Sequence, residues 1–503
     1  MVLLSRRKKN QLTPDMSGPI TLRNLTAQPL TLKIVERYEA PNAQNFPPNA
    51  GFSVNNLTSN FTTLLSTQPS HAQLSEKSQS FTKQDVDVRL EPFTTRRTDI
   101  KVSERGPNEI LRLTFQGDGG GRWRIDTPTP SSASQTLTPL TPEPKHDYTA
   151  IYLPSSSFLA LYESMNLQCW MKEFKDETPL SALSIPGTHN SPTHHKALPS
   201  VRCQAVSPLS QLQNGVRFFD IRVQPGKPED PNSDDLNLVH GVFPISLTGP
   251  KKFRDLLNVI LEFLKQNPTE TFIMSLKREG PGNATDHQLS LILKDHYTNI
   301  QHWYTEPRLP CLGEVRGRIV LMRRFALAER LTHEWQNRGW GLNAENWQYN
   351  TPDDTHGDVR VQDFCEVLET ENIEKKIGLC CDHFERCAAV VCPVPGITTD
   401  AAHPVPAGPL YLTFLSASNF WKTGFWPDRI AAKLNPAVTA FLCEKHDVGD
   451  KGTDGPGEEF KGDGAVGIVV CDWVGKDGDW DLVRCIVGMN SRLLLRQRGI
   501  GWR

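Results

Sequence analysis

The order of apolar and polar positions changes near residue 165, and the two parts of the chain predict different folds. From Ile20 to Tyr162 the apolar residues fall in short alternating runs, such as ITLRNLT, LTLKIVERY, EILRLTF and YTAIYLP, separated by turns rich in Gly, Pro, Asn and Ser. Strands of this length and spacing are typical of a β-sandwich. We therefore predict a β-sandwich-like accessory domain over residues 18–165.

Two stretches of this first part lack the pattern of a packed core. Residues 1–17 have a short apolar start before the basic cluster RRKK, and we interpret them as a disordered basic tail. Residues 127–146 are rich in Pro, Ser and Thr, and they predict a loop inside the β domain because a strand-like run follows them. We find no candidate catalytic site in the β domain.

After residue 166 the pattern becomes a strand followed by a helix, repeated along the chain. The run GPKKFRDLLNVILEFLKQNP places apolar residues on one helical face, whereas TFIMSLKRE, GRIVLMRRF, VRVQDF, LYLTFLSAS and AVGIVVCDWV have the composition of buried strands. The run DWDLVRCIVGMNSRLL predicts a final helix. Counting from SALSIPGTH, we expect eight strands, which predicts a distorted TIM-type β/α barrel over residues 166–503.

Three of these strands end at polar residues that suit acid–base chemistry. SALSIPGTHNS ends at His189 and Asn190, GVRFFDIRV at Asp220 and Arg222, and LNLVHG at His240. Histidine exchanges a proton near neutrality, and the guanidinium of arginine binds phosphate or carboxylate. The alternative is that each histidine satisfies a buried strand end, which explains one histidine better than it explains the whole set.

Most of the later strands also end in charged residues. These residues are Lys277, Glu279, Arg324, Asp363 and Asp472. Catalytic groups of TIM barrels lie at the C-terminal ends of the strands, so we expect all these side chains to face one mouth. Counted together with His189, Asp220, Arg222 and His240, the cationic groups outnumber the carboxylates, which predicts a negatively charged substrate with hydroxyl groups. The alternative for Lys277 and Arg324 is a structural ion pair.

Composition excludes some partners and leaves the location of the protein open. Lys and Arg total 55 against 57 Asp and Glu, so the net charge of -2 does not predict a nucleic-acid-binding surface. We see neither the residue order of a signal peptide nor an apolar run of about 18 residues, which leads us to expect a cytoplasmic protein with peripheral membrane contact. Non-classical secretion stays open because four N-x-[ST] sequons occur, at Asn24, Asn56, Asn60 and Asn283.

The chain has eleven cysteines, several of them in one short region. Cys380, Cys381, Cys387 and Cys392, with His383 among them, suggest a metal site. They lack a paired CxxC arrangement, however, and the surrounding run NIEKKIGLCCDHFERCAAVV predicts a helix. We therefore favour thiols packed in a core.

Six motifs in order resemble those of phosphatidylinositol-specific phospholipase C. They are PLSALSIPGTHNS, QLQNGVRFFDIRV, LVHG, FLKQNPTETFIMSLKRE, LGEVRGRIVLMRRF and VCDWV. The chain is most similar to the bacterial single-barrel type that carries the X domain alone, from about residue 170 to the C-terminus. The resemblance implies cleavage of phosphatidylinositol, or of a glycosylated phosphatidylinositol, to diacylglycerol and inositol cyclic phosphate.

The resemblance also implies roles for individual residues. His189 would be the general base and His240 the general acid, while Asp472 would orient His189. Arg222 would stabilise the phosphorane, and Asp220 would help to position the acid. The positions that bind inositol hydroxyls in the family correspond to Lys277, Arg324 and Asp363.

Three residues depart from the bacterial pattern. Asn190 stands where bacterial members have Asp, and Asn is typical of the calcium-dependent eukaryotic enzymes. Arg222, however, occupies the position of a metal-binding carboxylate in those enzymes and would repel Ca²⁺, so we expect no cofactor and calcium-independent activity. Cys365 replaces an aromatic residue that stacks on inositol. The alternatives are a catalytically weakened protein that binds lipid or inositol phosphate, and a phosphodiesterase acting on a related glycerophosphodiester.

The run SNFWKTGFWPD, residues 418–428, suggests a membrane-interface loop. Its indole rings, Trp421 and Trp426, belong to a residue type that prefers the membrane interface. The alternative is that these rings cap the barrel core. The expected partners are therefore a phosphatidylinositol-type lipid and a membrane surface, and the sequence does not address the oligomeric state.

Overall fold

The computed structural model describes residues 18–40, 74–75, 77–105, 108–128, 133–230, 232–392, 408–448 and 462–497. The basic tail expected over residues 1–17 lies outside the described residues. The chain divides into two compact units, one made of Met1–Asn24 with Gln28–Leu161 and the other of Leu25–Ala27 with Tyr162–Arg503. The sequence placed the boundary between residues 165 and 166.

The first unit contains two five-stranded sheets, with the orders β4-β1-β10-β9-β7 and β3-β2-β5-β6-β8. The strands are β1 (Pro19–Asn24), β2 (Leu30–Glu39), β3 (Thr82–Leu90), β4 (Thr94–Lys101), β5 (Glu109–Gly117), β6 (Arg122–Thr127), β7 (Ser134–Thr136), β8 (Thr138–Pro139), β9 (Tyr148–Leu153) and β10 (Phe158–Glu163), with the 3-10 turn η2 (Pro154–Ser156) before β10. Side chains of both sheets, including Leu22, Val35, Phe115 and Leu159, share one buried core. These sheets agree with the all-β pattern of the sequence.

The segment predicted as a Pro/Ser/Thr loop is partly ordered into strands. Within residues 127–146, β7 pairs with β9 and β8 pairs with β6. Between these two short strands, Leu137 is 1% exposed and belongs to the core of the unit. Burial of this one apolar side chain draws the segment onto both sheets, which its composition does not reveal.

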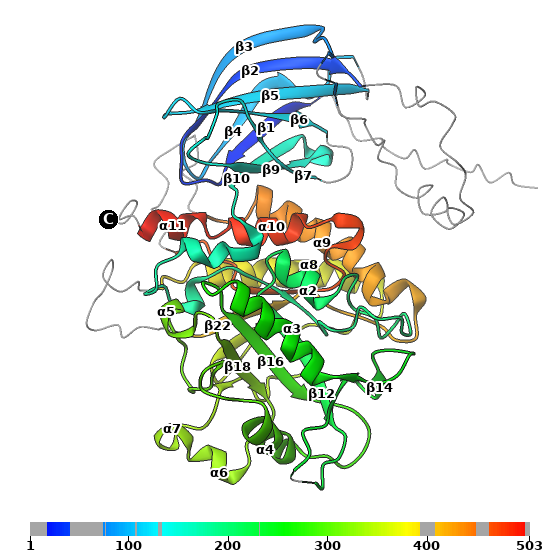
Figure 1. The fold of residues 1–503 in the computed structure, drawn as a ribbon. Helices are drawn as coiled ribbons and strands as arrows, with labels where there is room; N and C mark the ends of the chain where they lie inside the picture. Colours follow the sequence, from blue (N-terminus) through cyan, green and yellow to red (C-terminus); the bar gives the residue numbers. More distant parts are fainter. Residues whose placement is uncertain are drawn as a thin grey trace, which may run out of the picture. The chain divides into compact units, whose positions relative to one another are not determined.

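The second unit is built on parallel strands, several of which are visible in Figure 1. Among the described residues, eight strands form the row β19-β18-β16-β12-β11-β23-β22-β21. Their bounds are β11 (Ile185–Thr188), β12 (Phe218–Pro225), β16 (Phe272–Arg278), β18 (Ile319–Arg324), β19 (Leu342–Asn343), β21 (Val359–Gln362), β22 (Leu410–Phe414) and β23 (Ile468–Cys471). The two ends of the row meet where the Asp358 N–H donates to the Asn343 carbonyl oxygen at 2.9 Å. This closure corresponds to a distorted TIM-type barrel.

One predicted barrel strand is wrong, and another was missed. β13 (Leu236–His240), expected as a buried parallel strand, runs antiparallel to β12 and pairs with it at Val223 and Leu238. The connection between the two strands is too short for a parallel crossover, so the chain returns as a hairpin. The missing parallel strand is β19, which has only two residues and shows no periodic pattern.

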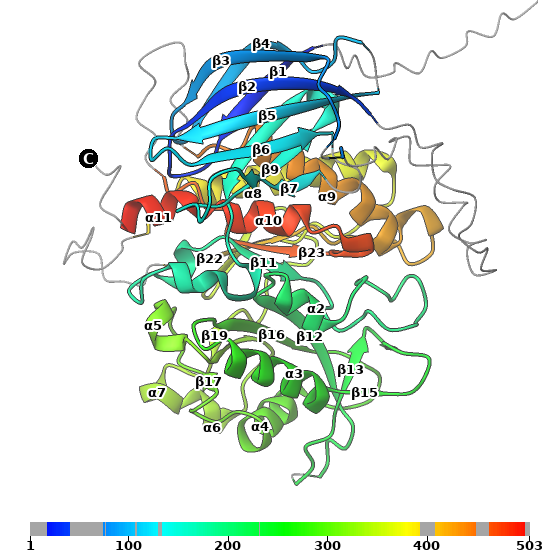
Figure 2. The same cartoon turned by 45° about the horizontal axis from the view of Figure 1, so that its top comes forward.

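Helices and short strands connect the row. The helices are α2 (Pro208–Gln213), α3 (Phe253–Gln266), α4 (Asp286–His296), α5 (Leu312–Val315), α6 (Glu329–Thr332), α7 (Glu334–Asn337), α8 (Thr370–Ala388), α9 (Pro427–Glu444), α10 (Asp481–Gly488) and α11 (Ser491–Gln497). The 3-10 helices are η3 (Leu167–Glu173), η4 (Leu180–Ala182), η5 (Thr423–Phe425) and η6 (Lys476–Gly478), and the short strands are β14 (Phe243–Pro244), β15 (Lys251–Lys252), β17 (Trp303–Tyr304) and β20 (Asp354–His356). Apolar side chains of α3 pack in one cluster with those of β12 and β16, and Figure 2 shows these elements together.

The C-terminal helix predicted from DWDLVRCIVGMNSRLL is broken into α10 and α11. At the break, Asn490 Oδ1 accepts from the Ser184 N–H at 2.8 Å, and Asn490 Nδ2 donates to the Ser184 carbonyl oxygen at 2.9 Å. This bidentate contact with a distant segment fixes the break. It is therefore a tertiary feature that helical periodicity cannot predict.

The cysteine-rich helix packs as expected. Cys380 and Cys387 lie on α8 and are buried, and Cys392 beyond the helix is buried as well. Cys381 is half-buried. The burial of these thiols is what packing in a core requires.

A fully buried ion pair joins the N-terminal ends of β12 and β16. Arg217, which precedes β12, donates to Glu270 at 2.8 Å, and both side chains are 0% exposed. The other donors of Arg217 bind backbone carbonyl oxygens, including those of Leu212 at 2.7 Å and Gln168 at 2.8 Å. Glu270 also accepts from the Met171 N–H at 3.1 Å. The pair therefore ties the strand starts to the chain that enters the unit.

Replacement of Arg217 should destabilise the barrel unit strongly. Arg217→Leu leaves the Glu270 carboxylate buried without its charged partner, which should lower the free energy of unfolding by about 3–5 kcal/mol. Urea unfolding followed by tryptophan fluorescence measures the change. The control is Arg330→Leu, because Arg330 pairs with Asp295 on the surface and its loss should cost about 1 kcal/mol or less. Equal losses in both variants would contradict a structural role of the buried pair.

Candidate active site

The register of two neighbouring strands brings the first catalytic candidates together. β11 and β23 are parallel, with Thr188 opposite Cys471, so His189 and Asp472 follow at adjacent strand ends. His189 Nδ1 lies 2.9 Å from Asp472 Oδ1. The Asp472 side chain is 4% exposed and that of His189 is 19% exposed. The pair has the geometry in which a buried carboxylate orients an imidazole whose ring stays accessible.

Burial and charge act against each other on this pair. Burial raises the pKa of Asp472 above its usual value, although His189 opposes the rise. Burial by itself lowers the pKa of His189, but the Asp472 carboxylate and the Cys203 sulfur raise it well above its usual range. The Asp472 carboxylate therefore favours uptake of a proton by the His189 ring and stabilises the imidazolium that results.

The second histidine faces the first across the mouth. His240, at the end of β13, has its ring centroid 6.1 Å from that of His189. Its Nδ1 lies 2.8 Å from the Val201 carbonyl oxygen, which assigns the proton of the neutral ring to Nδ1. Burial opposes protonation, but Cys203 and the Val201 carbonyl favour it, and the pKa of His240 lies above its usual value. The ring is therefore held in a fixed orientation by backbone.

Arg222 is the centre of a buried charge network. Its Nε and one terminal nitrogen donate to the two Asp220 carboxylate oxygens at 3.0 and 2.7 Å, and the other terminal nitrogen pairs with Glu279. Arg324 donates to Asp220 at 3.1 Å. Glu279 also accepts from the Gly241 N–H at 2.8 Å, next to His240. The network fixes the arginine from both sides.

The network keeps its carboxylates ionised. Burial would raise the pKa of Asp220, but Arg222 and Arg324 hold it well below its usual range. Burial likewise opposes ionisation of Glu279, whose pKa is lowered to about 2, chiefly by Arg222 and Lys277. Burial and the neighbouring Arg222 lower the pKa of Arg324 to about 10. All these groups are therefore charged at neutral pH.

The predicted inositol-binding residues lie around the same network. Lys277 Nζ is 3.5 Å from a Glu279 oxygen and Arg324 pairs with Asp220, so both cations take part in the network, and their role toward a substrate stays a prediction. The Arg324 guanidinium lies over the Trp347 ring, 3.8 Å from its centroid. Trp347 Nε1 donates to Asp363 at 3.1 Å. Arg324 and Asp363 are thus connected through one indole ring.

Sequence reasoning missed three residues of the site. Trp347 lies between β19 and β20, while Cys203 and Gln204 lie between β11 and α2. Gln204 Nε2 donates to the carbonyl oxygens of His189 and Cys471, at 2.7 and 3.0 Å, and so fixes the ends of β11 and β23. All three are on connections without periodic patterning, and no sequence signal used above could have found them.

The donor set of the site does not suit Ca²⁺. Ca²⁺ takes six to eight oxygen ligands, usually including several carboxylates. Asp220 and Glu279 already face Arg222, which is charged at every accessible pH. Asn190 lies beside a histidine, with Nδ2 2.9 Å from His189 Nε2, rather than in a ring of oxygen atoms. The positive charge near the mouth is therefore supplied by arginine.

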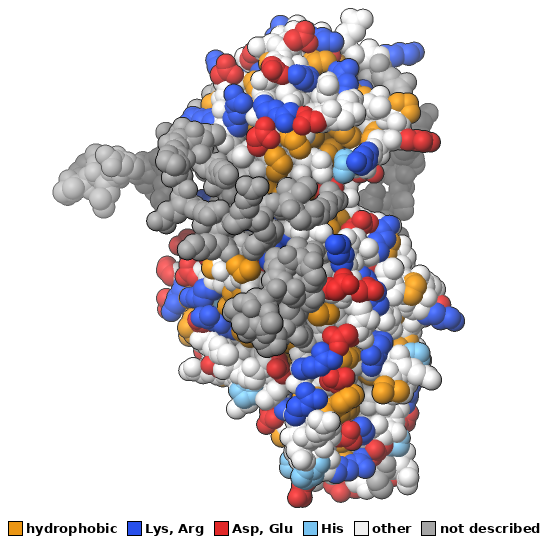
Figure 3. Space-filling model, turned by 90° about the vertical axis from the view of Figure 1, so that its left-hand side faces the viewer, with side chains coloured by type: hydrophobic (Ala, Val, Ile, Leu, Met, Phe, Trp, Pro, Cys, Tyr) orange, Lys and Arg blue, Asp and Glu red, His pale blue; other side chains and the backbone are white. Residues whose placement is uncertain are grey.

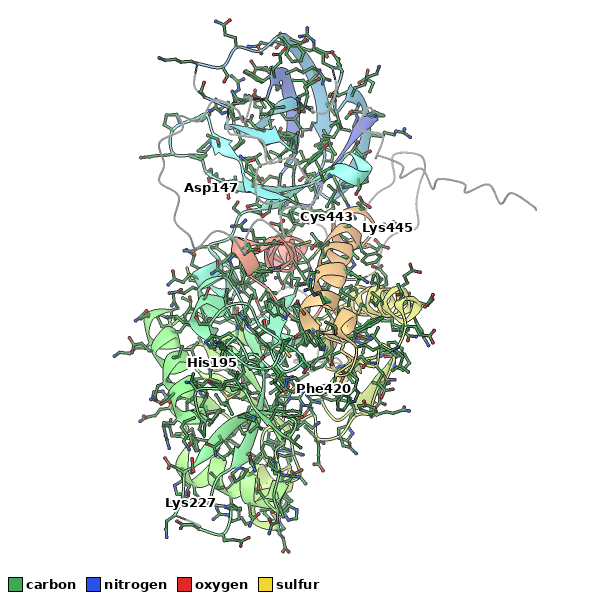
Figure 4. The ribbon with its side chains drawn as sticks, turned by 90° about the vertical axis from the view of Figure 1, so that its right-hand side faces the viewer. Asp147, His195, Lys227, Phe420, Cys443 and Lys445 are labelled. Atoms are coloured by element: carbon green, nitrogen blue, oxygen red, sulfur yellow. The ribbon has the colours of Figure 1, made fainter. Side chains whose placement is uncertain are left out.

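Two loops at the mouth carry exposed apolar side chains. Trp421, after β22, is 88% exposed, and Val242, after β13, is 63% exposed. The rings of Phe243 and Phe420 stack with centroids 5.3 Å apart, which joins the two loops; Phe420 is labelled in Figure 4. We call Val242, Phe243, Phe420 and Trp421 the rim patch. It provides a site for contact with an apolar surface.

Trp426 does not share the exposure of Trp421. It is half-buried at the start of α9, and its Nε1 donates to the Phe420 carbonyl oxygen at 3.2 Å. Its indole ring therefore holds the loop in place. The interface role stays a prediction for both residues, and the exposed Trp421 is the better placed of the two. Among the described residues, no helix is long and apolar enough to cross a membrane.

The lowered pKa of Glu279 makes part of the stability depend on pH. The pKa of Glu279 in the folded protein is about 2, against an ordinary value of 4.5. The ionised carboxylate therefore stabilises the fold above about pH 4.5, and this contribution disappears as pH falls toward about 2. Glu279→Gln should therefore lower the free energy of unfolding at neutral pH, with a smaller difference from the unmodified protein in acid. Urea unfolding across this range measures it, with the exposed Glu262→Gln as control. A pH-independent difference would be inconsistent with the ion pair.

Comparison with known proteins agrees with this geometry. Residues 177–325 match the family model "Phosphatidylinositol-specific phospholipase C, X domain". The chain is 31% identical over 217 residues to a 1-phosphatidylinositol phosphodiesterase of Listeria monocytogenes, covering 41% of this chain and 64% of the relative. It is 30% identical over 166 residues to the enzyme of that name from Staphylococcus aureus, covering 31% of this chain and 50% of the relative. The chain thus spans between half and 64% of the length of these relatives.

Solved structures of phosphatidylinositol-specific phospholipases C from the same two species are also similar to this chain. The phosphatidylinositol-specific phospholipase C of L. monocytogenes gives a TM-score of 0.45 at 23% identity, over 65% of this chain and 99% of the other. A structure of the S. aureus enzyme gives a TM-score of 0.47 at 21% identity, over 64% and 97%. The matched motifs and the family model thus make residues 177–325 similar to the X domain of phosphatidylinositol-specific phospholipase C.

Proposed function

We propose that the second unit cleaves phosphatidylinositol, or a glycosylated phosphatidylinositol, to diacylglycerol and inositol cyclic phosphate. The observation that carries this proposal is the pair of histidines with ring centroids 6.1 Å apart, one of them held by the buried Asp472. An arginine paired with two carboxylates lies on the neighbouring strand β12. The relatives named 1-phosphatidylinositol phosphodiesterase support the same substrate class.

In the first step His189 acts as the general base. Its Nδ1–H donates to Asp472, so Nε2 is the nitrogen that can take the proton of the inositol 2-hydroxyl as this oxygen attacks phosphorus. Asp472 then stabilises the imidazolium. In the present state Asn190 Nδ2 lies 2.9 Å from Nε2, so the hydroxyl displaces this amide when substrate binds.

His240 acts as the general acid. Its Nδ1 is oriented by the Val201 carbonyl, and the raised pKa favours the protonated ring that an acid requires. The proton goes to the departing diacylglycerol oxygen, which would otherwise leave as an alkoxide. Glu279, which accepts from the Gly241 N–H, helps to place the end of β13.

Arg222 stabilises the negative charge that grows on the phosphorane oxygens. A guanidinium has five N–H donors, and three pairings to Asp220 and Glu279 leave others for the phosphate. Because the carboxylates hold it in place, little reorganisation is needed during the reaction. Arg324, Lys277 and Asp363 surround this centre and are proposed to bind the inositol hydroxyls.

Assay of inositol cyclic phosphate released from phosphatidylinositol vesicles tests the proposal. His189→Ala and His240→Ala should each lower turnover by about 10²–10⁴-fold, the usual contribution of general acid–base catalysis. A soluble substrate with a phenolate-like leaving group needs no acid, so it should restore turnover by His240→Ala but not by His189→Ala. Circular dichroism checks that both variants are folded.

Two outcomes would contradict the assignment. If both variants lost turnover equally on both substrates, the assignment of His189 as the base and His240 as the acid would be wrong. Binding of phosphatidylinositol vesicles without release of any product would favour the catalytically weakened lipid-binding alternative. Product release from a different glycerophosphodiester, with none from phosphatidylinositol, would instead favour the second alternative.

The rim patch is proposed to contact the lipid surface. Side chains of both charge signs are mixed over the described residues of the face in Figure 3, which is the side opposite to that of Figure 4. The source of attraction that we propose for the rim patch is apolar insertion, with the interface preference of the exposed Trp421 indole as its main element.

Trp421→Ala should weaken binding to phosphatidylinositol vesicles by about tenfold, because an exposed indole contributes roughly 1–2 kcal/mol on burial. Hydrolysis of a soluble substrate and the melting temperature should not change. Trp426→Ala is the matched comparison, and it should lower the melting temperature because that indole holds the loop. If Trp421→Ala also lost stability and soluble-substrate turnover, the ring would be structural and the interface role would be wrong.

A further inference from the structure

The thiol of Cys203 lies between groups of the proposed catalytic site but has no role in the mechanism above. Cys203 is 0% exposed, and its Sγ lies 3.9 Å from His240 Nδ1 and 3.8 Å from Asn190 Nδ2. One ligand atom each from His189, Cys203 and Asp472 lies within 4.8 Å of the other two. Within the described ranges, no other group of three or more His, Cys, Asp or Glu residues meets this spacing.

These donors suit one class of metal ion. Nitrogen, sulfur and oxygen ligands together are typical of Zn²⁺, whereas Ca²⁺ and Mg²⁺ take oxygen ligands. Ligands about 2.0–2.3 Å from Zn²⁺ in a tetrahedral site lie roughly 3.3–3.7 Å from one another. His189 Nδ1 and Asp472 Oδ1 are 2.9 Å apart, closer than this spacing, and no pair of ligand atoms is more than 4.8 Å apart, so side-chain shifts of about 1 Å or less bring the group to it.

A buried amide supplies a second, independent indication of a ligand. Asn190 is 2% exposed, and its Oδ1 has no hydrogen-bond partner in the part of the chain that is described. The Nδ2 of the same amide lies 2.9 Å from His189 Nε2 and 3.8 Å from Cys203 Sγ. Rotation of the amide by half a turn would exchange the two atoms and bring a neutral oxygen donor to the cluster.

The charges of the cluster also match a divalent ion. Asp220 on the neighbouring strand already pairs with Arg222 and Arg324. An additional buried cation therefore needs other negatively charged groups beside it. One thiolate and the Asp472 carboxylate together offset the two charges of Zn²⁺. A site of His189, Cys203 and Asp472 is therefore neutral when it is occupied.

We propose that His189, Cys203 and Asp472 form a Zn²⁺ site that switches the enzyme off. On binding, the Cys203 S–H bond ionises, a sulfur–zinc bond forms and one proton is released, with no change in oxidation state. The neutral His189 ring binds the metal through one nitrogen and keeps its single proton on the other, so the ring no longer serves as general base. The inhibition depends on the proposed function, whereas the binding of the metal does not.

Metal binding and turnover are measured separately on the full chain. The protein is stripped with a chelator, kept reduced with a phosphine rather than a thiol, and titrated with Co²⁺ as a spectroscopic probe and with Zn²⁺ by calorimetry. Co²⁺ should give the near-ultraviolet thiolate charge-transfer band, which Zn²⁺ should abolish by displacement. Zn²⁺ should inhibit release of inositol cyclic phosphate over the same concentration range as it binds, and chelator should restore turnover.

Cys203→Ser should remove the charge-transfer band and weaken Zn²⁺ binding at least about tenfold. Inhibition is compared with the uninhibited rate of each variant. Cys381→Ser is the matched control, because Cys381 is a more exposed thiol outside the cluster and its loss should change neither quantity. An unaltered band in Cys203→Ser, or no thiolate band in the unmodified chain, would overturn the proposal.

The two proposals fail in distinguishable ways. If the thiolate band and Zn²⁺ binding appear but no inositol cyclic phosphate is released, the metal site stands and the proposed hydrolysis is wrong. If inositol cyclic phosphate is released and Zn²⁺ neither binds at Cys203 nor inhibits, the hydrolysis stands and the metal site is wrong. Inhibition that persists in Cys203→Ser would place the inhibitory ion elsewhere and would equally overturn the proposal.

Discussion

The ionised Asp220 carboxylate, completely buried on β12, is the constraint on which the site depends. A buried charge is tolerated only when opposite charges pair with it, and here Arg222 and Arg324 do so from two sides. Glu279 completes the pairing of Arg222 and, through the Gly241 N–H, reaches the end of the strand that carries His240. One buried anion therefore determines where the cations of the mouth can lie.

This arrangement separates binding charge from acid–base chemistry. The arginines pair with carboxylates whose pKa values are lowered. These ion pairs therefore persist over a wide range of pH, and the arginines keep their positions. The two histidines lie beside a different set of groups, Asp472, Cys203 and the Val201 carbonyl, which act on their proton affinity. A phosphodiester that enters this mouth would meet fixed positive charge on one side and titratable rings on the other.

The packing around His189 also accounts for the inhibition by Zn²⁺ that we infer. The proposed base His189 is oriented by the Asp472 carboxylate and lies near the Cys203 thiol. These three groups together are the donor set of a zinc site. Asn190 adds a neutral amide beside that cluster. The proposed catalysis and the proposed metal binding therefore share His189 and Asp472. Cys203 is needed only for the metal.

The sequence by itself determined the alternation of strands and helices, the all-β character of the first part and the polar ends of the strands. His189, Asp220, Arg222 and Asp472 could be found because strand composition and the position of a polar residue are local properties. Only tertiary structure decided that β13 returns antiparallel, that β19 closes the row and that Asn490 breaks the last helix, since these depend on pairing between distant segments. The placement of Cys203, Trp347 and Gln204 likewise depends on loops, whose conformation is fixed by contacts and not by periodicity.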